Sequence, residues 1–364
     1  MPTPVVMDSF FEFASRQLRQ LITRHPDRFP MYTTGGKWDI RGESWTNWCE
    51  GFLCGQLWLL YQHTGDPFWR ENAEHYSRLI EPRKTDRSVH DLGFLFWPSW
   101  KRWYDLSGDP AINSVVIEAG QTLALRFQEK GGYLRSFLAK GSLFIDIMMN
   151  VGIILYAANQ RGDANLEQIA RQHCSTTRKY LVRGDGSTAH EGIFDLQTGQ
   201  FLHQSTQQGW RADSSWARGL AWAVSGFTTV YQMTNDAHFL ATAELCAQYY
   251  IDHTPPHGVP PNDWDEPDPT LPYESSAAAI TASGLLDLSL VCPDQARADL
   301  YRQAAVHILD TLCSPEFLPV ATPGWEGLLK HGIYHQRKGL GVDESVMWGD
   351  YFLMEAMSKV KHER

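Results

Sequence analysis

The amino-acid sequence predicts an all-α fold, a six-hairpin (α/α)6 barrel or toroid, as a single domain over residues 1–364. Three observations predict it. A helix–turn–helix pattern recurs along the chain, the first helix of each hairpin is apolar nearly all round, and β-strand signals are sparse. A helix that is apolar all round is buried on every side, so we expect an inner ring of helices inside an amphipathic outer ring.

Each predicted hairpin is marked by a tight polar turn that contains an aspartate. A glycine in such a turn adopts the left-handed conformation that ends the first helix, and the aspartate then caps the second. Pro67 and Pro110 fall at the first position of the second helix, where the missing N–H costs nothing. The turn aspartates are Asp66, Asp109, Asp163, Asp236 and, more loosely, Asp294.

The predicted inner helices share small and apolar residues on all faces, and each has an amphipathic outer partner, about twelve helices in all. The inner helices are 50–61, 90–105, 144–158, 217–231, 275–290 and 346–360, and the outer helix nearest the N-terminus is 9–22. Only residues 188–203 are typical of a β-hairpin, with Thr198 and Gly199 as its turn.

The bulk composition excludes several classes of protein. A formal net charge of -10 argues against nucleic acid or an anionic membrane surface as a partner. No signal peptide is expected, and the apolar stretch near 143–158 is too short to span a membrane. The six cysteines form no CxxC pair and the fourteen histidines show no metal-binding spacing. We therefore expect a cytoplasmic protein with free thiols and no metal or other cofactor.

Asp146 lies in the run FIDIMMN (144–150), which is predicted to be part of a buried helix. An isolated buried carboxylate is costly unless it is paired or protonated. Desolvation would raise the pKa of Asp146, which suits a general acid near neutral pH. Asn150 follows four residues later and could hydrogen-bond to it. The alternative is a structural aspartate that is satisfied by backbone donors.

Asp91 directly precedes another apolar run. It could be the N-cap of that helix, or a second carboxylate that faces a pocket with His90 beside it. A pair of carboxylates is the usual catalytic equipment of glycosidases. The spacing of the two aspartates does not by itself bring them together.

Arg218, Trp222 and Ser225 share one face of the fourth inner helix. An arginine on a buried helix needs an anion, which could be a protein carboxylate or the carboxylate of a bound substrate. The chain is rich in tryptophan, and Trp45, Trp216 and Trp222 could each stack on a sugar ring or simply pack. His190, in the predicted β-hairpin, could be functional or structural.

Several segments together resemble the unsaturated glucuronyl hydrolases, glycoside hydrolase family 88. The most specific combination is HDLGF (90–94), FIDIMMN (144–150) and SSWARGLAW (214–222), in this order. The resemblance covers most of the chain and extends to residues 27–32, 44–66, 180–195, 273–286 and 348–357.

The resemblance implies a six-hairpin α/α barrel and a hydrolase that acts on unsaturated uronic-acid oligosaccharides left by polysaccharide lyases. The enzyme would remove the Δ4,5-unsaturated uronic acid from the non-reducing end by hydrating its vinyl ether, without a cofactor. Asp146 would protonate C4 and assist water addition at C5, while Asp91 would hold the ring hydroxyls and keep Asp146 poised as an acid. The implied pocket residues are Trp45, His190, Gln208, Trp216, Arg218 and Trp222.

The chain departs from the family pattern at Gln207, where the family often has a histidine, and Trp210 and Arg211 add bulk and charge nearby. These differences bear on the aglycone and its sulfation. Three other functions remain open: an unsaturated rhamnogalacturonyl hydrolase, an inverting hydrolase of saturated glycans with Asp350 or Glu274 as base, and a sugar-binding protein without catalysis. Linkage, uronic acid epimer and oligomeric state also stay open.

Overall fold

The computed structural model describes residues 4–40, 47–267 and 273–362. The chain forms two compact units. Unit 1 consists of Met1–Ile80, Thr254–Asn262 and Pro269–Arg364, and unit 2 consists of Glu81–His253 and Asp263–Asp268. The single-domain organisation stays a prediction.

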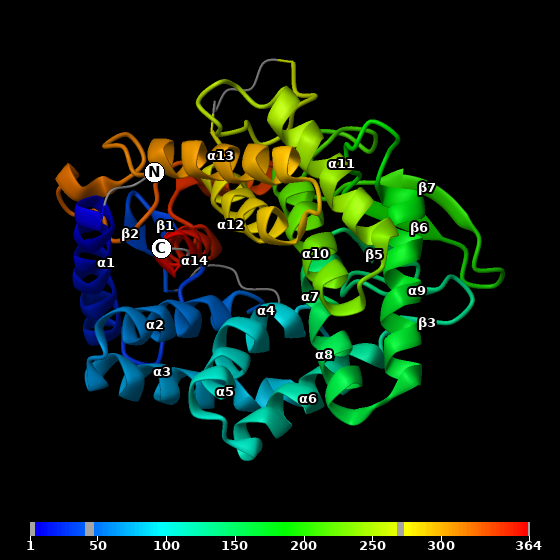
Figure 1. Ribbon diagram of the computed structural model, residues 1–364, viewed down its shortest axis with the longest axis horizontal. Coiled ribbons are helices and arrows are strands. Elements are labelled where there is room, and N and C mark those ends of the chain that lie inside the picture. Colours follow the sequence, from blue (N-terminus) through cyan, green and yellow to red (C-terminus); the bar gives the residue numbers. More distant parts are fainter. Residues whose placement is uncertain (1–3, 41–46, 268–272, 363–364) are drawn as a thin grey trace. The chain divides into compact units, whose positions relative to one another are not determined.

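Unit 1 is built from helices that pack in pairs. Helix α2 packs on α3, α12 runs beside α13, and α14 contacts α1, α2 and α12 (Figure 1). Unit 1 also contains two short antiparallel ladders, β1–β2 and β8–β9. The helices are α1 (Pro4–Arg24), α2 (Glu50–Thr64), α3 (Pro67–Ile80), α12 (Ser275–Val291), α13 (Gln295–Leu312) and α14 (Met347–His362), with short 3-10 turns η3 (Pro319–Ala321) and η4 (Gln336–Lys338). The strands are β1 (Thr33–Thr34), β2 (Lys37–Trp38), β8 (Gly332–His335) and β9 (Leu340–Glu344).

Unit 2 also consists of paired helices, together with a small sheet. Helix α6 packs on α8, α8 on α9, and α10 on α11, while strands β5, β6 and β7 form an antiparallel sheet in this order. The helices are η1 (Glu81–Thr85), α4 (Leu92–Phe96), η2 (Trp97–Lys101), α5 (Arg102–Ser107), α6 (Pro110–Ala124), α7 (Ile147–Asn150), α8 (Gly152–Arg161), α9 (Ala164–Leu181), α10 (Ala217–Thr234) and α11 (Ala237–His253). The strands are β3 (Phe127–Gln128), β4 (Tyr133–Leu134), β5 (Ser142–Phe144), β6 (Glu191–Phe194) and β7 (Phe201–Ser205).

The turns that join these helices confirm the predicted capping. Gly65, Gly108 and Gly162 have φ of 68°, 65° and 62° and end their helices in the left-handed conformation. The Asp109 carboxylate accepts the N–H of Ala111 at 2.8 Å. The other turn aspartates accept N–H groups in the same way: Asp66 from Phe68, Asp163 from Asn165 and Leu166, Asp236 from His238 and Asp294 from Arg297.

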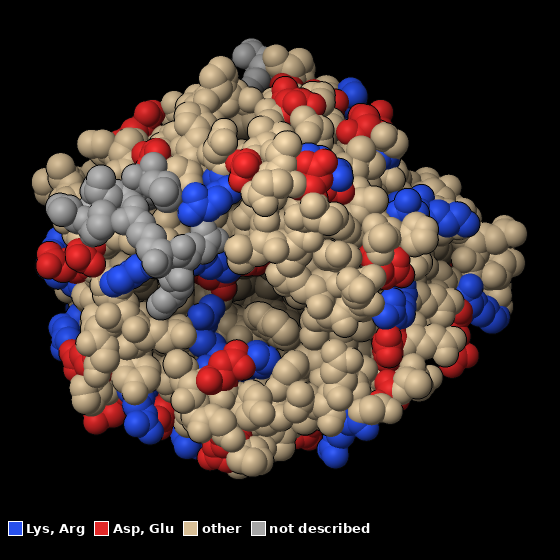
Figure 2. All heavy atoms as spheres, in the orientation of Figure 1, with Lys and Arg blue, Asp and Glu red and all other residues tan. Residues whose placement is uncertain are grey.

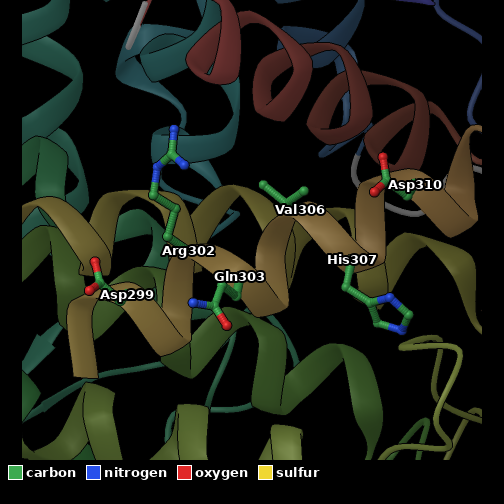
Figure 3. Close-up of a pocket in the computed structure, with 6 residues that line it drawn as sticks. All are labelled: Asp299, Arg302, Gln303, Val306, His307 and Asp310. Atoms are coloured by element: carbon green, nitrogen blue, oxygen red, sulfur yellow. The ribbon is translucent and has the colours of Figure 1, made fainter. Parts of the chain in front are cut away.

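Inner and outer helices differ in burial as predicted. Residues 51–60 of α2 and 275–286 of α12 are all buried. Helix α13 instead exposes one polar face, on which residues at three- and four-residue spacing line a shallow pocket (Figure 3). These residues are Asp299, Arg302, Gln303, Val306, His307 and Asp310.

The prediction is partly wrong for two of the inner helices. The helix predicted over 144–158 starts only at Ile147, because Ser142–Phe144 is a strand that pairs with β6. The helix predicted over 90–105 is interrupted by the π-helical turn η2, which contains Pro98. Proline has no N–H to continue the regular hydrogen-bond ladder, which explains the interruption.

The strand content also exceeds the prediction. The predicted hairpin is confirmed as β6–β7, with Gly199 at φ 76° in its turn. The described residues contain four further ladders: β1–β2, β3–β4, β5–β6 and β8–β9. Their strands have two to five residues each, too short for an alternating apolar pattern to mark them. No described helix combines the length and the apolar character needed to cross a membrane.

Candidate active site

Asp146 lies where β5 ends and α7 begins, with helical backbone angles (φ −58°, ψ −27°). The preceding N–H, of Ile145, donates to the carbonyl of His190 at 2.9 Å, which ties this corner to the start of β6. The Asp146 side chain is partly accessible, but its Oδ1 atom is buried and accepts no hydrogen bond from the described residues. A buried oxygen without a protein partner requires an explanation, and a bound substrate is one.

Asn150 links the backbone at Asp146 to helix α4 through two hydrogen bonds. Its Nδ2 donates to the backbone carbonyl of Asp146 at 3.1 Å, and its Oδ1 accepts the N–H of Phe94 at 2.8 Å. The expected hydrogen bond from Asn150 to Asp146 therefore exists, but to the backbone rather than to the carboxylate. Gly93 permits the close approach, because a Cβ there would lie 2.4 Å from the Asn150 Cα.

Asp91 occupies the N-cap position of α4, yet its side chain accepts no capping hydrogen bond. Its ψ of 17° is not the extended conformation of a working N-cap. Asn150 accepts the N–H of Phe94 instead, so the Asp91 carboxyl is not needed to cap the helix. The side chain is 4 % exposed, and its Oδ1 lies 3.3 Å from Nε2 of His90.

The two aspartates influence each other electrostatically. Burial raises the pKa of Asp91 to about 8, with a further rise from the charge of Asp146 and an opposing effect from Arg126. Burial also raises the pKa of Asp146 to about 7, against the opposing charge of Arg218. Carboxyls that interact in this way titrate as a pair. The pair therefore keeps a proton near neutral pH, as a general acid requires.

His90 is a neutral side chain with a defined tautomer. Its Nδ1 accepts the N–H of Phe137 at 3.0 Å, so the ring proton lies on Nε2, beside Asp91. Burial, together with the nearby charge of Arg126, holds the pKa of His90 well below its usual value.

His190 has the same arrangement. Its Nδ1 accepts the N–H groups of Gln207 and Gln208 at 3.1 and 3.3 Å, which leaves the ring proton on Nε2. The ring lies between Phe144 and Trp216, with centroid distances of 4.7 and 4.6 Å. His190 is thus both structural, because it holds the loop after β7, and close to the other predicted site residues.

Gln208, Trp216 and Arg218 form one cluster at the start of α10. Nη2 of Arg218 donates to Oε1 of Gln208 at 2.5 Å. The Arg218 guanidinium also lies 4.4 Å from the centroid of the Trp216 ring. The charge of Arg218 acts on Asp146, which links the cluster to the carboxylate pair.

The remaining two tryptophans behave differently. Trp222 is fully buried, and its ring packs on Phe94 of α4 at a centroid distance of 4.9 Å. This contact favours packing over sugar stacking as its role. Trp45 lies outside the described residues.

Arg126, which sequence reasoning missed, is a buried cation near Asp91. Its guanidinium donates to the backbone carbonyls of Arg87, Arg135 and Ser136, which fixes it in place. Its charge opposes the rise in the pKa of Asp91. The only available signal was an arginine within the apolar run LALRF (123–127).

Buried carboxylates hold the loop that precedes α10. Asp263 accepts the N–H of Trp210 at 2.8 Å and the hydroxyl of Ser214 at 2.6 Å. Glu191 accepts the side-chain amide of Gln207 at 2.9 Å. Sequence reasoning did not identify Asp263 or Glu191. Asp263 is far in sequence from Trp210 and Ser214, and Glu191 comes near Gln207 only because β6 pairs with β7.

Glu274 and Asp350, the candidate bases of an inverting glycosidase, both bind backbone N–H groups in unit 1. Glu274 accepts the N–H groups of Ser276, Ala277 and Ile333. Asp350 accepts those of Leu328 and Leu329 at 2.8 and 3.0 Å. Both carboxylates therefore have a structural role. Each joins the start of a helix, α12 for Glu274 and α14 for Asp350, to a neighbouring segment.

The raised pKa values predict that the protein loses stability as the pH rises. Between about pH 4 and pH 8 the folded chain binds more protons at Asp91 and Asp146 than the unfolded chain does. We expect the free energy of unfolding to fall by roughly 1–3 kcal/mol between pH 7 and pH 8.5, a range in which the buried neutral His90 and His173 no longer oppose the change because unfolded histidines are neutral there too. Urea unfolding followed by tryptophan fluorescence measures this, and Asp91→Asn should show a smaller fall. An equal or larger fall in the variant would contradict the assignment.

Comparison with known proteins places the chain in a family. A sequence model described as Glycosyl Hydrolase Family 88 matches residues 20–253. The chain belongs to Glycosyl Hydrolase Family 88. The unsaturated glucuronyl hydrolase of Bacillus sp. (strain GL1) is 31% identical over 349 residues, covering 92% of this chain and 91% of that protein. The unsaturated chondroitin disaccharide hydrolase of Streptococcus pneumoniae (strain ATCC BAA-255 / R6) is 32% identical over 325 residues, covering 86% of this chain and 81% of that protein.

A solved structure shows the same fold. The crystal structure of the unsaturated glucuronyl hydrolase from Bacillus sp. GL1, described as responsible for the degradation of glycosaminoglycan, covers 98% of this chain and 97% of that one. The TM-score is 0.92 at 29% identity. The predicted family 88 membership, the all-α six-hairpin fold class and the glycoside hydrolase activity are therefore confirmed.

Proposed function

We propose that this family 88 chain removes a Δ4,5-unsaturated uronic acid from the non-reducing end of oligosaccharides by hydrating the vinyl ether. The carboxyl of Asp146 is the observation that carries the proposal. Its buried Oδ1 has no hydrogen-bond partner among the described residues, and its pKa is raised to about 7. The relatives support the substrate class, since they are named as hydrolases of unsaturated glucuronyl and chondroitin saccharides.

The proposed reaction uses Asp146 first as an acid and then as a base. Asp146 gives its proton to C4 of the C4=C5 double bond, and the resulting cation is shared between C5 and the ring oxygen. The Asp146 carboxylate then takes a proton from water as the water oxygen bonds to C5. The hemiketal opens to a ketone at C5, and the hemiacetal left at C1 expels the rest of the saccharide as an alcohol. Asp91, as a carboxylate, stabilises the cation.

The cluster at the start of α10 supplies groups that fit the sugar. The guanidinium of Arg218 suits the uronate carboxylate, and its hydrogen bond to Gln208 holds it in place. The Nε2–H of His190 provides a further donor. The ring of Trp216 contacts both His190 and the guanidinium of Arg218, so it can help to position both.

The test is turnover of unsaturated disaccharides from chondroitin, hyaluronan, heparin, gellan and rhamnogalacturonan by the purified chain. We expect the absorbance of the conjugated double bond to disappear on one or more of the first four. Selective turnover of the rhamnogalacturonan product would favour the rhamnogalacturonyl hydrolase. Cleavage of saturated disaccharides alone would favour an inverting glycosidase, and tight binding without turnover would favour a sugar-binding protein.

Two supporting properties concern partners and location. None of the six cysteines forms a disulfide in the described part of the chain, which fits a reducing compartment such as the cytoplasm. Acidic and basic side chains are interspersed on the face shown in Figure 2. With a formal net charge of -10, such a surface gives no general attraction for nucleic acid.

A further inference from the structure

The two ring nitrogens of His90 contact different parts of unit 2. Nδ1 accepts the N–H of Phe137 at 3.0 Å, and Nε2 lies 3.3 Å from Oδ1 of Asp91. The ring is 1 % exposed and is stacked on the Phe137 ring, with Phe144 at its edge. The imidazole therefore cannot rotate without losing its contacts, and its Nε2–H stays beside the Asp91 carboxyl.

Burial keeps His90 neutral and is the largest cause of its lowered pKa. Arg126, which follows α6, His190 before β6 and His173 on α9 each oppose a positive charge on the ring as well. His90 is therefore a fixed dipole next to Asp91 rather than a titrating group.

Several charged groups act on the buried carboxyl of Asp91, besides the dipole of His90. Asp146 and Asp86 oppose its negative form, while Arg126 and Arg83 favour it. The buried Arg126 is fixed by three backbone carbonyls, and Arg83 is paired with Asp86 at 3.1 Å. The 3.3 Å approach of His90 Nε2 to Oδ1 is a further polar contact of the Asp91 carboxyl.

We propose that His90 is a positioning residue whose Nε2–H dipole stabilises the Asp91 carboxylate and so keeps the shared proton available on Asp146. This inference rests on the proposed function, in which Asp146 delivers that proton to the sugar. It assigns His90 no contact with the substrate. It acts only through Asp91.

The consequence depends on which aspartate binds the proton more strongly. Burial and the charge of Asp146 both raise the pKa of Asp91, so this carboxyl competes with Asp146 for the shared proton. Any loss of stabilisation of the Asp91 carboxylate moves that proton toward Asp91 and lowers the population of the reactive form, in which Asp146 carries it. Losing the His90 dipole should therefore lower kcat directly.

Two substitutions separate the roles of the two nitrogens. His90→Asn keeps an acceptor near the position of Nδ1 and loses the donor beside Asp91, whereas His90→Gln keeps a donor near Nε2 and loses the acceptor for Phe137. For His90→Asn we expect a roughly three- to tenfold lower kcat, an almost unchanged KM, and a pH–activity profile shifted upward by about half to one unit. His90→Gln should keep the profile and most of kcat.

The pattern of the two variants decides the proposal. If His90→Asn keeps the wild-type kcat and profile, or if His90→Gln shows the same upward shift, His90 is only structural and the proposal is overturned. Thermal melting of both variants identifies any loss caused by unfolding. A carboxyl ¹³C NMR titration, which needs no substrate, should show a higher pKa for Asp91 in His90→Asn; an unchanged value overturns the proposal even in a poorly active variant. Failure of wild-type turnover would instead reject the proposed function.

Discussion

Asp146→Asn is expected to lower kcat on an unsaturated disaccharide by at least about a thousandfold while the fold remains intact. The amide is far too weak an acid to protonate C4 and far too weak a base to take a proton from water, so both proposed steps are lost. The substitution keeps the shape of the side chain. It also removes the cost of a charge whose Oδ1 is buried without a protein partner, so stability should be unchanged or slightly higher.

The measurement is the initial rate of loss of the double-bond absorbance, with circular dichroism and thermal melting to establish folding. Asp252→Asn is a matched control, because Asp252 is exposed on α11 and its contact is a side-chain amide of Gln248. The control should retain the wild-type rate. A folded Asp146→Asn protein with activity within tenfold of the wild type would refute the role of Asp146.

Gly93→Ala should have the second-largest effect, on stability and activity together. A Cβ at Gly93 would lie 2.4 Å from the Cα of Asn150 and 2.8 Å from its Oδ1. Because the first of these is a backbone atom, α4 and α7 must move apart, and the hydrogen bond from Phe94 to Asn150 is strained or lost. We expect a loss of roughly 2–4 kcal/mol in the free energy of unfolding. We also expect at least about a tenfold loss of kcat, because Asp91 and Asp146 are displaced from each other.

Gly184→Ala provides the control for Gly93→Ala. Gly184 is exposed in the same unit, a Cβ added to it would meet no atom within 4 Å, and its backbone is not left-handed. This change should be neutral or slightly stabilising. Urea midpoints of the two variants test the difference. Equal midpoints would mean that α4 does not approach α7 this closely. Adding Asn150→Ala should not rescue Gly93→Ala, because the added Cβ clashes with the backbone of residue 150 and not with its side chain.

Local sequence predicts those parts of the fold that depend on neighbours in the chain. Gly108, Asp109 and Pro110 end one helix and start the next through their own conformational preferences, and the structure has them in these roles. The all-round apolar character of α2 and α12 likewise requires no knowledge of the partners that cover them. The presence of a carboxylate within an apolar run was sufficient to select Asp146.

The surroundings of Asp146 depend on residues far away in sequence and were therefore not predictable. The segment before it is a strand only because β6 pairs with it, with Ser142 opposite Ile193 and Phe144 opposite Glu191. The local pattern of the same segment is equally compatible with a buried helix, which is why the helix boundary was wrong. Asn150 and Arg126 act through backbone groups, and their partners are visible only once the chain is folded.

The division into two units has a consequence for folding during synthesis. Unit 2 is almost continuous, since Glu81–His253 supplies most of it, whereas unit 1 needs Met1–Ile80 together with Pro269–Arg364. Helices α1 and α2 both pack on α14, which is translated after unit 2. The early helices must therefore wait with exposed apolar surface while all of unit 2 is translated, and unit 2 can fold first. Chaperones that shield nascent chains would act mainly on these early helices, which carry neither Asp91 nor Asp146.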